Sequence, residues 1–425
     1  MDKIIHSVTL DTDKCKGCTN CIKMCPTQAI RVRKNKAKII KELCIDCGEC
    51  IRVCPYHAKK AVTDSFDMIN NYKYKIALPA PAFYGQFDKA TKIESILHAL
   101  IKAGFDDVFE VAYAAQLITK RTKELIASGE LETPIINSAC PAVVNLISTK
   151  YPSLLNNVIP LISPMNLAAI MARKIAEEKT PYKGSEIGIF FITPCAAKAT
   201  CTKFPLGLPE SVIDGAFSFK DMYLKVVPHL NDKECEQDLS KAGFKGVCWA
   251  NCGGEVVSLE LDNYIAVDGI HNVIHVLEEI ENDKLSDVEY VEALACTGGC
   301  VGGPLAVENN FVAQTRVKKM AKTARGNGEA PEFDMDLVWQ TPIKIRKQRN
   351  LDDDMFVAME KLAKIDEIYD RLPKLDCGSC GSPSCRALAE DIVRGYSKES
   401  DCIIKFKEKI ALFANEMLDG SDNVE

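Results

Sequence analysis

The feature that most constrains this chain is a run of four cysteines that occurs twice near its N-terminus. The run C-x2-C-x2-C-x3-C-P begins at Cys15 and is repeated, with its proline, from Cys44. Twenty of the 425 residues are cysteine and only six are histidine, so any metal bound here is expected to be held by sulfur. In a reducing compartment, clustered cysteines indicate metal binding rather than disulfides. The cysteines form three groups, within residues 15–54, 140–300 and 377–402.

The first group predicts two [4Fe–4S] clusters. Three cysteines at two-residue gaps can wrap around one cubane, whereas the fourth cysteine of such a run ligates the other cluster. A polar hairpin, AIRVRKNKAKII, is expected between the cluster loops, and a pair of zinc sites is the alternative. Residues 1–62 closely resemble the bacterial dicluster ferredoxins, which implies an electron relay. The expected ligands are Cys15, Cys18, Cys21 and Cys54 for the first cluster, and Cys44, Cys47, Cys50 and Cys25 for the second.

The last cysteine group predicts one more cluster. Its spacing is C-x2-C-x4-C-x16-C, and Gly378 and Gly381 let backbone N–H groups turn toward the sulfurs. The pattern resembles the small iron–sulfur domain of electron-transport and corrinoid proteins, which carries one [4Fe–4S] cluster. Four lone thiolates also suit Zn²⁺, which is the alternative. The expected ligands are Cys377, Cys380, Cys385 and Cys402.

Between these groups, residues 73–315 alternate apolar, strand-like runs with amphipathic helical stretches. Buried strands separated by helices predict a mainly parallel α/β domain, in which ligands gather at the carboxyl ends of the strands. The expected strands are 75–80, 107–113, 134–137, 158–162, 187–193, 246–250 and 288–295.

Four cysteines of the middle group follow three of these expected strands. They are Cys140 after 134–137, Cys195 after 187–193, and Cys296 and Cys300 after 288–295. The last two lie in the glycine-rich segment ACTGGCVGGP, which permits close backbone approach and a helix start. Free N–H groups at a helix start favour an anionic cluster. This pattern by itself predicts one buried cluster.

Three segments around these cysteines carry a more specific resemblance. SACP (138–141), TPCAAK (193–198) and EALACTGGCVGG (292–303) together resemble the signature segments TSCCP, MPCxxKxxE and ExMACxGGCxxGG of the catalytic domain of [FeFe]-hydrogenases. The resemblance implies a two-lobed α/β domain and an enzyme that acts on H2. It also implies an H-cluster, in which a [4Fe–4S] cubane adjoins a di-iron unit carrying CO, CN⁻ and an azadithiolate. The implied cubane ligands are Cys140, Cys195, Cys296 and Cys300.

The same resemblance assigns two further roles, and this chain differs from the family pattern at four positions. Cys300 would bridge to the di-iron unit, and Lys198 would donate a hydrogen bond to a cyanide ligand, unless it is a solvated surface lysine. Where the family has a proton-relay cysteine, this chain has Ala139, and where it has a glutamate, this chain has Cys201. Two methionines of the family are replaced by Thr193 and Leu294.

These substitutions, together with the C-terminal cluster domain, resemble the divergent sensory branch of the family, called group D. They imply slow turnover, because alanine cannot pass a proton. Water beside Ala139 or a thiol path through Cys201 is expected to carry protons instead.

Three other cysteines lie outside the ligand sets. Cys235 is expected to be an exposed bystander. Cys248 and Cys252, at the end of an expected strand, occupy a segment that lines the di-iron pocket in the family, and Cys252 is a candidate for contact with the cofactor. The alternative for both is that they are small apolar core residues.

The chain is thus expected to be a multidomain protein with α+β and α/β parts. The predicted divisions are a ferredoxin-like domain (1–62), the H-cluster domain (73–315), a connector (316–354) and a helix with the C-terminal cluster domain (355–425). One face of that helix carries Phe356, Met359, Leu362, Ile365 and Tyr369, and is expected to pack on the hydrogenase domain or to join two copies of the chain in a homodimer.

Composition excludes several function classes. The net charge of −6 and the lack of a basic tract argue against nucleic acid as a partner. The apolar runs are too short to cross a membrane, and the N-terminus lacks the apolar stretch of a signal peptide, so a cytoplasmic protein is expected.

Three functions remain as hypotheses. The first is a slow hydrogenase that senses H2 and reports to a downstream signalling protein. The second is a catalytic hydrogenase coupled to ferredoxin or another redox protein partner, with H2 and protons as substrates. The third is a non-catalytic, hydrogenase-like protein of iron–sulfur assembly, whose members lack the C-terminal cluster domain and the full Lys198 motif.

Overall fold

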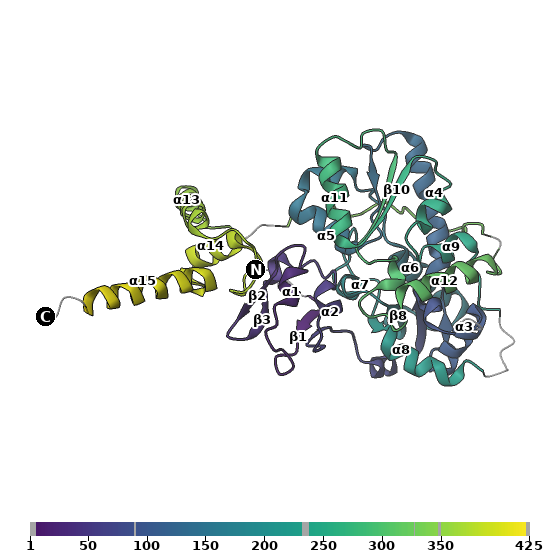
Figure 1. Cartoon of the computed structure of the whole chain (residues 1–425). Coiled ribbons are helices and arrows are strands. Elements are labelled where there is room, and N and C mark those ends of the chain that lie inside the picture. The colour runs from purple at the N-terminus through teal and green to yellow at the C-terminus, as the bar shows by residue number, and fades with distance from the viewer. Residues whose placement is uncertain (1–5, 89–90, 232–237, 327, 347–349, 422–425) are drawn as a thin grey trace.

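The structure is a computed structural model that describes residues 6–88, 91–231, 238–326, 328–346 and 350–421. A small N-terminal part lies between the large central part and a C-terminal part made of helices (Figure 1). Within the described residues, no helix combines the length and the apolar character needed to cross a membrane.

The N-terminal part consists of two short antiparallel strand pairs and the loops that carry the first eight cysteines. The hairpin expected between the cluster loops is present and turns at Lys34 and Asn35, whose φ angles are 50° and 59°. Positive φ at both turn residues matches the twist of a two-residue hairpin. The elements are β1 (Val8–Leu10) paired with β4 (Lys59–Ala61), β2 (Ile30–Arg33) paired with β3 (Lys36–Ile39), α1 (Asn20–Lys23) and α2 (Glu49–Arg52).

The central part has two parallel sheets, which form the two lobes predicted from the sequence. The larger sheet has the order β6-β5-β8-β9, and every residue of β8 is buried. Stacked rings of Phe190 and Phe217 fill its core, with centroids 5.4 Å apart. Its strands are β5 (Tyr74–Pro79), β6 (Asp107–Val108), β8 (Ile187–Thr193) and β9 (Gly215–Ser218), and its helices include α3 (Ile93–Lys102), α4 (Val111–Ser128), α6 (Pro164–Lys179) and α8 (Phe219–Val226).

The smaller sheet has the order β10-β11-β7 and a hydrophobic core of its own. Loops that follow β7, β8 and β11 meet between the lobes, which is where parallel strands deliver ligand-binding residues. The strands are β7 (Ile135–Ile136), β10 (Tyr264–Asp268) and β11 (Tyr290–Leu294). The remaining central helices are α5 (Pro141–Lys150), α7 (Ala196–Cys201), α9 (Phe244–Cys248), α10 (Gly254–Leu259), α11 (Ile270–Glu281) and α12 (Asn310–Lys322).

Three of the seven expected strands are wrong in whole or in part. Residues 246–250 begin within α9, and residues 111–113 open α4. The run 158–162 forms only isolated bridges, from Val158 to Ile136 and from Leu161 to Val338. Short apolar runs do not distinguish a buried strand from a buried helix turn. The strands β9 (GAFS) and β10 (YIAVD) were not predicted from the sequence, because each is a short run of four or five residues.

The segment predicted to be a connector packs closely on the central part. The indole Nε1 of Trp339 donates a hydrogen bond to the Leu161 carbonyl at 2.7 Å, and the backbone N–H of Gln340 donates one to the Gly207 carbonyl at 2.8 Å. Residues 337–340 therefore belong to the wall of the central part rather than to a free spacer.

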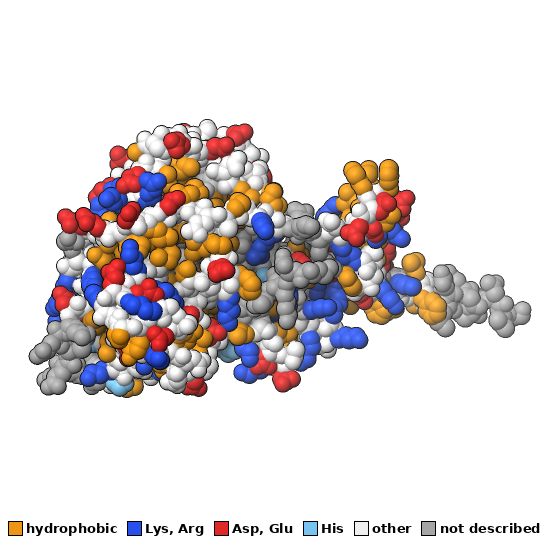
Figure 2. Space-filling view, turned by 180° about the vertical axis from the view of Figure 1, so that it is seen from behind, with side chains coloured by type: hydrophobic (Ala, Val, Ile, Leu, Met, Phe, Trp, Pro, Cys, Tyr) orange, Lys and Arg blue, Asp and Glu red, His pale blue; other side chains and the backbone are white. Residues whose placement is uncertain are grey.

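The C-terminal part contains α13 (Met355–Arg371), α14 (Cys385–Val393) and α15 (Ile403–Ser421), and α15 projects away from the other elements (Figure 1). The expectation that α13 packs on the hydrogenase domain is wrong. Ile365 and Ile368 of α13 pack on α14 instead, in a separate small core. Phe356 is 80% exposed, and apolar side chains are visible on this arm (Figure 2). The homodimer stays a prediction.

Gly207 provides a test of how firmly the segment 337–340 is attached. Gly207 and Gly129 both have positive φ, 77° and 68°, but an added Cβ would collide with the Trp339 ring only at Gly207. We expect Gly129→Ala to cost about 1 kcal/mol through backbone strain, and Gly207→Ala to cost about 2–4 kcal/mol because overpacking is added. Urea unfolding with limited proteolysis of residues 337–346 measures both, and equal effects of the two substitutions would contradict this packing.

Candidate functional site

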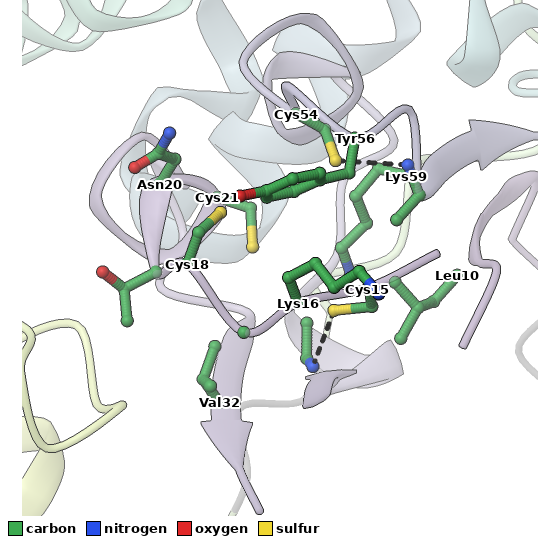
Figure 3. A pocket seen from close by; sticks show the side chains of 14 residues that line it. Leu10, Cys15, Lys16, Cys18, Asn20, Cys21, Val32, Cys54, Tyr56 and Lys59 are labelled. Atoms are coloured by element: carbon green, nitrogen blue, oxygen red, sulfur yellow. Dashed lines mark hydrogen bonds between the residues drawn. The ribbon is translucent and has the colours of Figure 1, made fainter. Parts of the chain in front are cut away.

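The first cysteine set, Cys15, Cys18, Cys21 and Cys54, surrounds one cavity in the N-terminal part (Figure 3). Two of its sulfurs already accept backbone hydrogen bonds. The N–H of Ala37 donates to the Cys15 Sγ at 3.4 Å, and the N–H of Ala58 donates to the Cys54 Sγ at 3.3 Å. Such bonds to sulfur tune the potential of an iron–sulfur cluster. Cys54 lies with the first run of cysteines, as the spacing predicts.

The second cysteine set consists of Cys25, Cys44, Cys47 and Cys50. Burial raises the pKa of Cys50 to about 12 and those of Cys44 and Cys47 well above the ordinary range, and the nearby Cys25 thiol raises all three further. Cys25 is therefore close to the second run, as the spacing predicts. Thiols gathered in this way stay protonated without a metal, and metal binding offsets that cost.

Lys59 provides an independent sign that an anion belongs between the first two sets. Lys59 is 3% exposed, and its Nζ has no hydrogen-bond partner within the described part of the chain. Its charge lowers the pKa of Cys21 in the first set and of Cys50 in the second, although burial raises both more strongly. A buried, unpaired ammonium group is costly. Two anionic iron–sulfur clusters would supply the missing negative charge. Lys59 and the first two cysteine sets therefore fit such clusters.

The third cysteine set comes from three loops between the two lobes. Cys140 and Cys195 occupy the residues just before α5 and α7, and Cys296 and Cys300 follow β11. Burial raises the pKa of Cys195 to about 12, and the thiols of Cys140 and Cys300 add to the effect. The pKa of Cys296 is raised by burial and by the same neighbours. The structure thus brings together the four cysteines that the sequence predicts.

Lys198 lies against this third set. Its Nζ donates a hydrogen bond to the Cys300 Sγ at 3.7 Å. Burial alone would lower the pKa of Lys198, but the thiol groups of Cys300, Cys195 and Cys140 more than offset this, so its pKa is raised. A charged ammonium group is therefore held at the cysteine set, and the alternative of a solvated surface lysine is not supported.

A cavity adjoins Cys300 and Lys198. The methyl group of Ala139 and the side chain of Leu294 face it, which are two of the positions where this chain departs from the hydrogenase pattern. Thr193, another departure, does not line the cavity, and its hydroxyl accepts a hydrogen bond from the Cys195 N–H at 3.1 Å. The cavity therefore lies directly beside the cysteine set.

Two buried carboxyl groups, Glu255 and Glu292, also line this cavity, and the sequence reasoning missed them as functional residues. The Tyr290 hydroxyl donates to a Glu255 carboxyl oxygen at 2.6 Å, and the Asn137 amide donates to the other at 2.9 Å. Glu292 accepts backbone N–H groups from Gly253 at 2.9 Å and Val256 at 3.1 Å. Burial raises the pKa of both carboxyl groups, so each can hold a proton near neutral pH.

The remaining predicted residues lie at different distances from the site. Cys201 lines a smaller cavity that also contains Ala139 and Trp339, and burial raises its pKa to about 12. Cys252 does not line the cavity beside Cys300; its thiol interacts with Asp268. Cys248 is buried in the core, as the alternative interpretation predicts. Cys235 lies outside the described residues.

The loop of the second cysteine set touches the loop of the third. The Arg52 guanidinium donates a hydrogen bond to the Gly302 carbonyl at 2.9 Å. An added Cβ on Gly48, next to Cys47, would collide with Pro304. The two loops are therefore in van der Waals contact.

The fourth cysteine set, Cys377, Cys380, Cys385 and Cys402, gathers in the C-terminal part. Cys380, Cys385 and Cys402 belong to the small core between α13 and α14. Cys402 and Cys377 both raise the pKa of Cys380, although burial has the larger effect, so all three thiols are close together.

Comparison with protein families agrees with this arrangement. The profile described as "Iron only hydrogenase large subunit, C-terminal domain" matches residues 73–204 and 219–304, which is just over half of the chain. The chain belongs to this iron-only hydrogenase family. A 4Fe-4S dicluster profile matches residues 7–55, and a profile for an Fe–S cluster matches residues 372–404. The protein is therefore a metal-binding, iron–sulfur member of the family.

Individual relatives are distant. Iron hydrogenase 1 of Clostridium pasteurianum is 25% identical over 379 residues, covering 71% of this chain and 65% of the relative. The NADP-reducing hydrogenase subunit HndD of Solidesulfovibrio fructosivorans is 23% identical over 210 residues, covering 47% of this chain and 32% of the relative. The chain thus spans less than two thirds of either relative.

Solved structures of similar fold include an apo [FeFe]-hydrogenase HydA1 from Chlamydomonas reinhardtii. It is 17% identical with a TM-score of 0.47, and the match covers 61% of this chain and 87% of that chain. The hydrogenase HydA(deltaEFG) is 18% identical with a TM-score of 0.45, and covers 59% and 84% respectively.

The unpaired Lys59 generates a testable prediction. Replacing it by an uncharged residue of similar length, Lys59→Met, should lower the reduction potentials of both ferredoxin-like clusters by roughly 50–100 mV, because a buried positive charge favours the reduced, more negative state. The control is Lys60→Met, whose ammonium group is largely exposed and lies 3.6 Å from Asp11. EPR-monitored redox titration gives the potentials. Equal potentials in wild type and Lys59→Met would show that Lys59 does not face the clusters.

Proposed function

We propose that this protein interconverts H2 with protons and electrons at an H-cluster held by the third cysteine set. The observation that carries the proposal is the juxtaposition of four thiols, the Lys198 ammonium group and a cavity beside Cys300. Cys140, Cys195, Cys296 and Cys300 would hold the cubane. Cys300, which alone of the four faces the cavity, would bridge to a di-iron unit carrying CO, CN⁻ and an azadithiolate.

The di-iron unit, when bound, supplies the site at which H2 is split or formed. The residues around it hold and move charge. The Lys198 ammonium group is placed to donate a hydrogen bond to an anionic ligand such as cyanide, in a cavity where charge-assisted bonds are strong. Apolar side chains such as Met165, Phe191 and Leu294 line the rest of the cavity and limit the access of water.

Proton transfer needs a titratable group near the reacting centre, and the sequence suggested Cys201 for this role. With its pKa raised to about 12, the Cys201 thiol stays protonated at neutral pH and is a poor proton donor. We propose that Glu292 and Glu255 carry protons instead, because both line the cavity and both have raised pKa values. Groups whose pKa lies near the operating pH are the efficient acids and bases.

Electrons would reach the site through the first and second cysteine sets, as [4Fe–4S] clusters. With the H-cluster cubane and the fourth set, the protein would carry four cubanes and a di-iron unit, or about eighteen iron atoms per chain. We propose the domain division expected from the sequence, 1–62, 73–315, 316–354 and 355–425, although α12 (Asn310–Lys322) crosses the boundary at 315/316 and residues 337–340 pack on the central part.

The charge of the N-terminal part supports a redox protein as partner. Residues 6–62 contain twelve Lys and Arg but five Asp and Glu, whereas the whole chain carries −6. Cys18 of the first set is exposed, with the exposed Lys14 and Lys16 beside it. Such a surface attracts an acidic electron carrier. A downstream signalling protein is the partner expected for the sensory role.

Ala139 favours a slow, sensory hydrogenase over a bulk catalyst, because no side chain can pass protons from that position. A ferredoxin-coupled catalytic hydrogenase is the second candidate, and the Glu255–Glu292 pair is the observation that favours it. A non-catalytic assembly protein is the least supported, because Lys198 and the fourth cysteine set are both in place.

Isotope exchange tests the proposed activity directly. Protein matured with its di-iron unit should exchange deuterium between D2 and H2O at a measurable but low rate. Lys198→Ala should lose the di-iron unit and the exchange, whereas the control Lys203→Ala should not, since Lys203 pairs with Asp64 at the surface at 2.8 Å. Mass spectrometry of the gas phase gives the rate. Absence of exchange in protein that holds the di-iron unit would contradict the proposal.

A second prediction concerns the route of protons. We expect Glu292→Gln and Glu255→Gln to lower H2 evolution from a reduced dye by about 10–100-fold. Cys201→Ala should have a smaller effect. The control is Glu260→Gln, whose exposed carboxylate pairs with Lys123 and Lys245 outside the cavity.

All variants are compared at equal di-iron content, measured by infrared absorption. Rates of Glu292→Gln and Glu255→Gln that match Glu260→Gln would show that protons enter elsewhere. A loss in Cys201→Ala equal to that in Glu292→Gln would restore the thiol path.

A further inference from the structure

The fourth cysteine set is attached to the first by a contact between two segments that are far apart in the sequence. The Val32 N–H of β2 donates a hydrogen bond to the Gly381 carbonyl at 2.7 Å. The Arg33 guanidinium donates one to the Cys380 carbonyl at 3.1 Å. The loop that carries two of the C-terminal cysteines is thus bonded to the edge of the ferredoxin-like hairpin.

A buried ion-pair network fixes this contact. One oxygen of Asp391 accepts hydrogen bonds from Arg31 Nε at 2.6 Å, from Arg33 Nη2 at 2.7 Å and from the Ser382 hydroxyl at 2.9 Å. Asp391 is 2% exposed, and the Arg31 side chain is 9% exposed. Removing one partner from a buried pair leaves an uncompensated charge. The network therefore favours one docked position of the C-terminal part.

Val32 and Ile22 of the ferredoxin-like part lie next to the loop that carries Cys377 and Cys380. Val32 lines the cavity of the first set, on the side that faces the C-terminal loop (Figure 3). Ile22 follows Cys21, and an added Cβ on Gly378 would lie 3.4 Å from its Cδ1. Gly378 itself follows Cys377, so residues adjacent to ligands of both sets are close neighbours.

We propose that the C-terminal cluster is an electron station docked on the first ferredoxin-like cluster. Electrons would pass between the fourth and third cysteine sets through the first and second, in that order. Each step moves one electron, oxidising one cubane from [4Fe–4S]⁺ to [4Fe–4S]²⁺ and reducing its neighbour in the opposite sense. Asp391 is the positioning residue for the first step. This inference rests on the proposed iron occupancy of the cysteine sets but not on activity toward H2.

The experiment uses the full chain with its cubanes installed and without the di-iron unit, so hydrogenase activity does not enter the result. The clusters are reduced with a low-potential one-electron reductant, and spin relaxation is measured by pulsed EPR. In wild type, the reduced C-terminal cluster should relax faster through magnetic interaction with the first ferredoxin-like cluster. Asp391→Ala should lose this enhancement with unchanged iron content. The control Asp366→Ala, which removes an exposed ion pair with Arg386 on the same helices, should keep it.

Two further variants keep the test decisive. Cys380→Ser removes the C-terminal cluster and identifies its signal by subtraction. Arg33→Ala breaks the contact from the ferredoxin-like side, so it tests docking even where Asp391→Ala lowers cluster occupancy. An isolated C-terminal signal in wild type, a C-terminal site filled by zinc, or an interaction of unchanged strength in Asp391→Ala and Arg33→Ala would each overturn the inference.

Discussion

The structure depends on the burial of cysteine thiols in four separate sets. Burial raises the pKa of members of every set, and neighbouring thiols raise it further, so without metal these groups are protonated and poorly solvated. Metal binding favours the deprotonated form of these thiols, because the thiolate is the ligand and the cluster replaces water around it. The folds of the N-terminal and C-terminal parts, which have only small hydrophobic cores, are expected to be stable only with their clusters in place.

Two positively charged side chains lie next to the buried cysteine sets. Lys59 is buried between the first two sets, and Lys198 lies against the third, each where an anionic cluster would accumulate charge. The contacts between sets follow a single order along the molecule. The fourth set adjoins the first through β2, the N-terminal part carries the first and second sets, and Arg52 joins the second to the third. The carboxyl groups of Glu255, from α10, and Glu292, from β11, line the cavity beside Cys300.

The sequence predicted the cysteine sets well because their chemistry is encoded in local spacing. Even the exchange of Cys25 and Cys54 between the two runs follows from the length of the loops. Parallel strands such as β8 were also predictable, because a long, fully apolar run has few alternatives. Residues 246–250 were assigned wrongly because five apolar or small residues suit a helix turn as well as a strand.

The missed features depend on contacts between distant residues. Glu292 and Glu255 are ordinary acidic residues in the sequence, and only the fold buries them at one cavity. The pairing of Asp391 with Arg31 joins positions 360 residues apart and has no local pattern. Trp339 lies in a segment rich in charge, glycine and proline, which is typical of a connector, yet its ring packs against Gly207.

The infrared spectrum of the matured protein tests the central claim, that the third cysteine set and the adjoining cavity hold an H-cluster, most directly. Bands of CO and CN⁻ ligands should appear in wild type, in the spectral region where proteins themselves do not absorb. They should be absent from Cys300→Ala, which removes the proposed bridge between the two halves of the cofactor. A wild-type protein that contains its cubanes and yet shows no such bands after maturation would contradict the account.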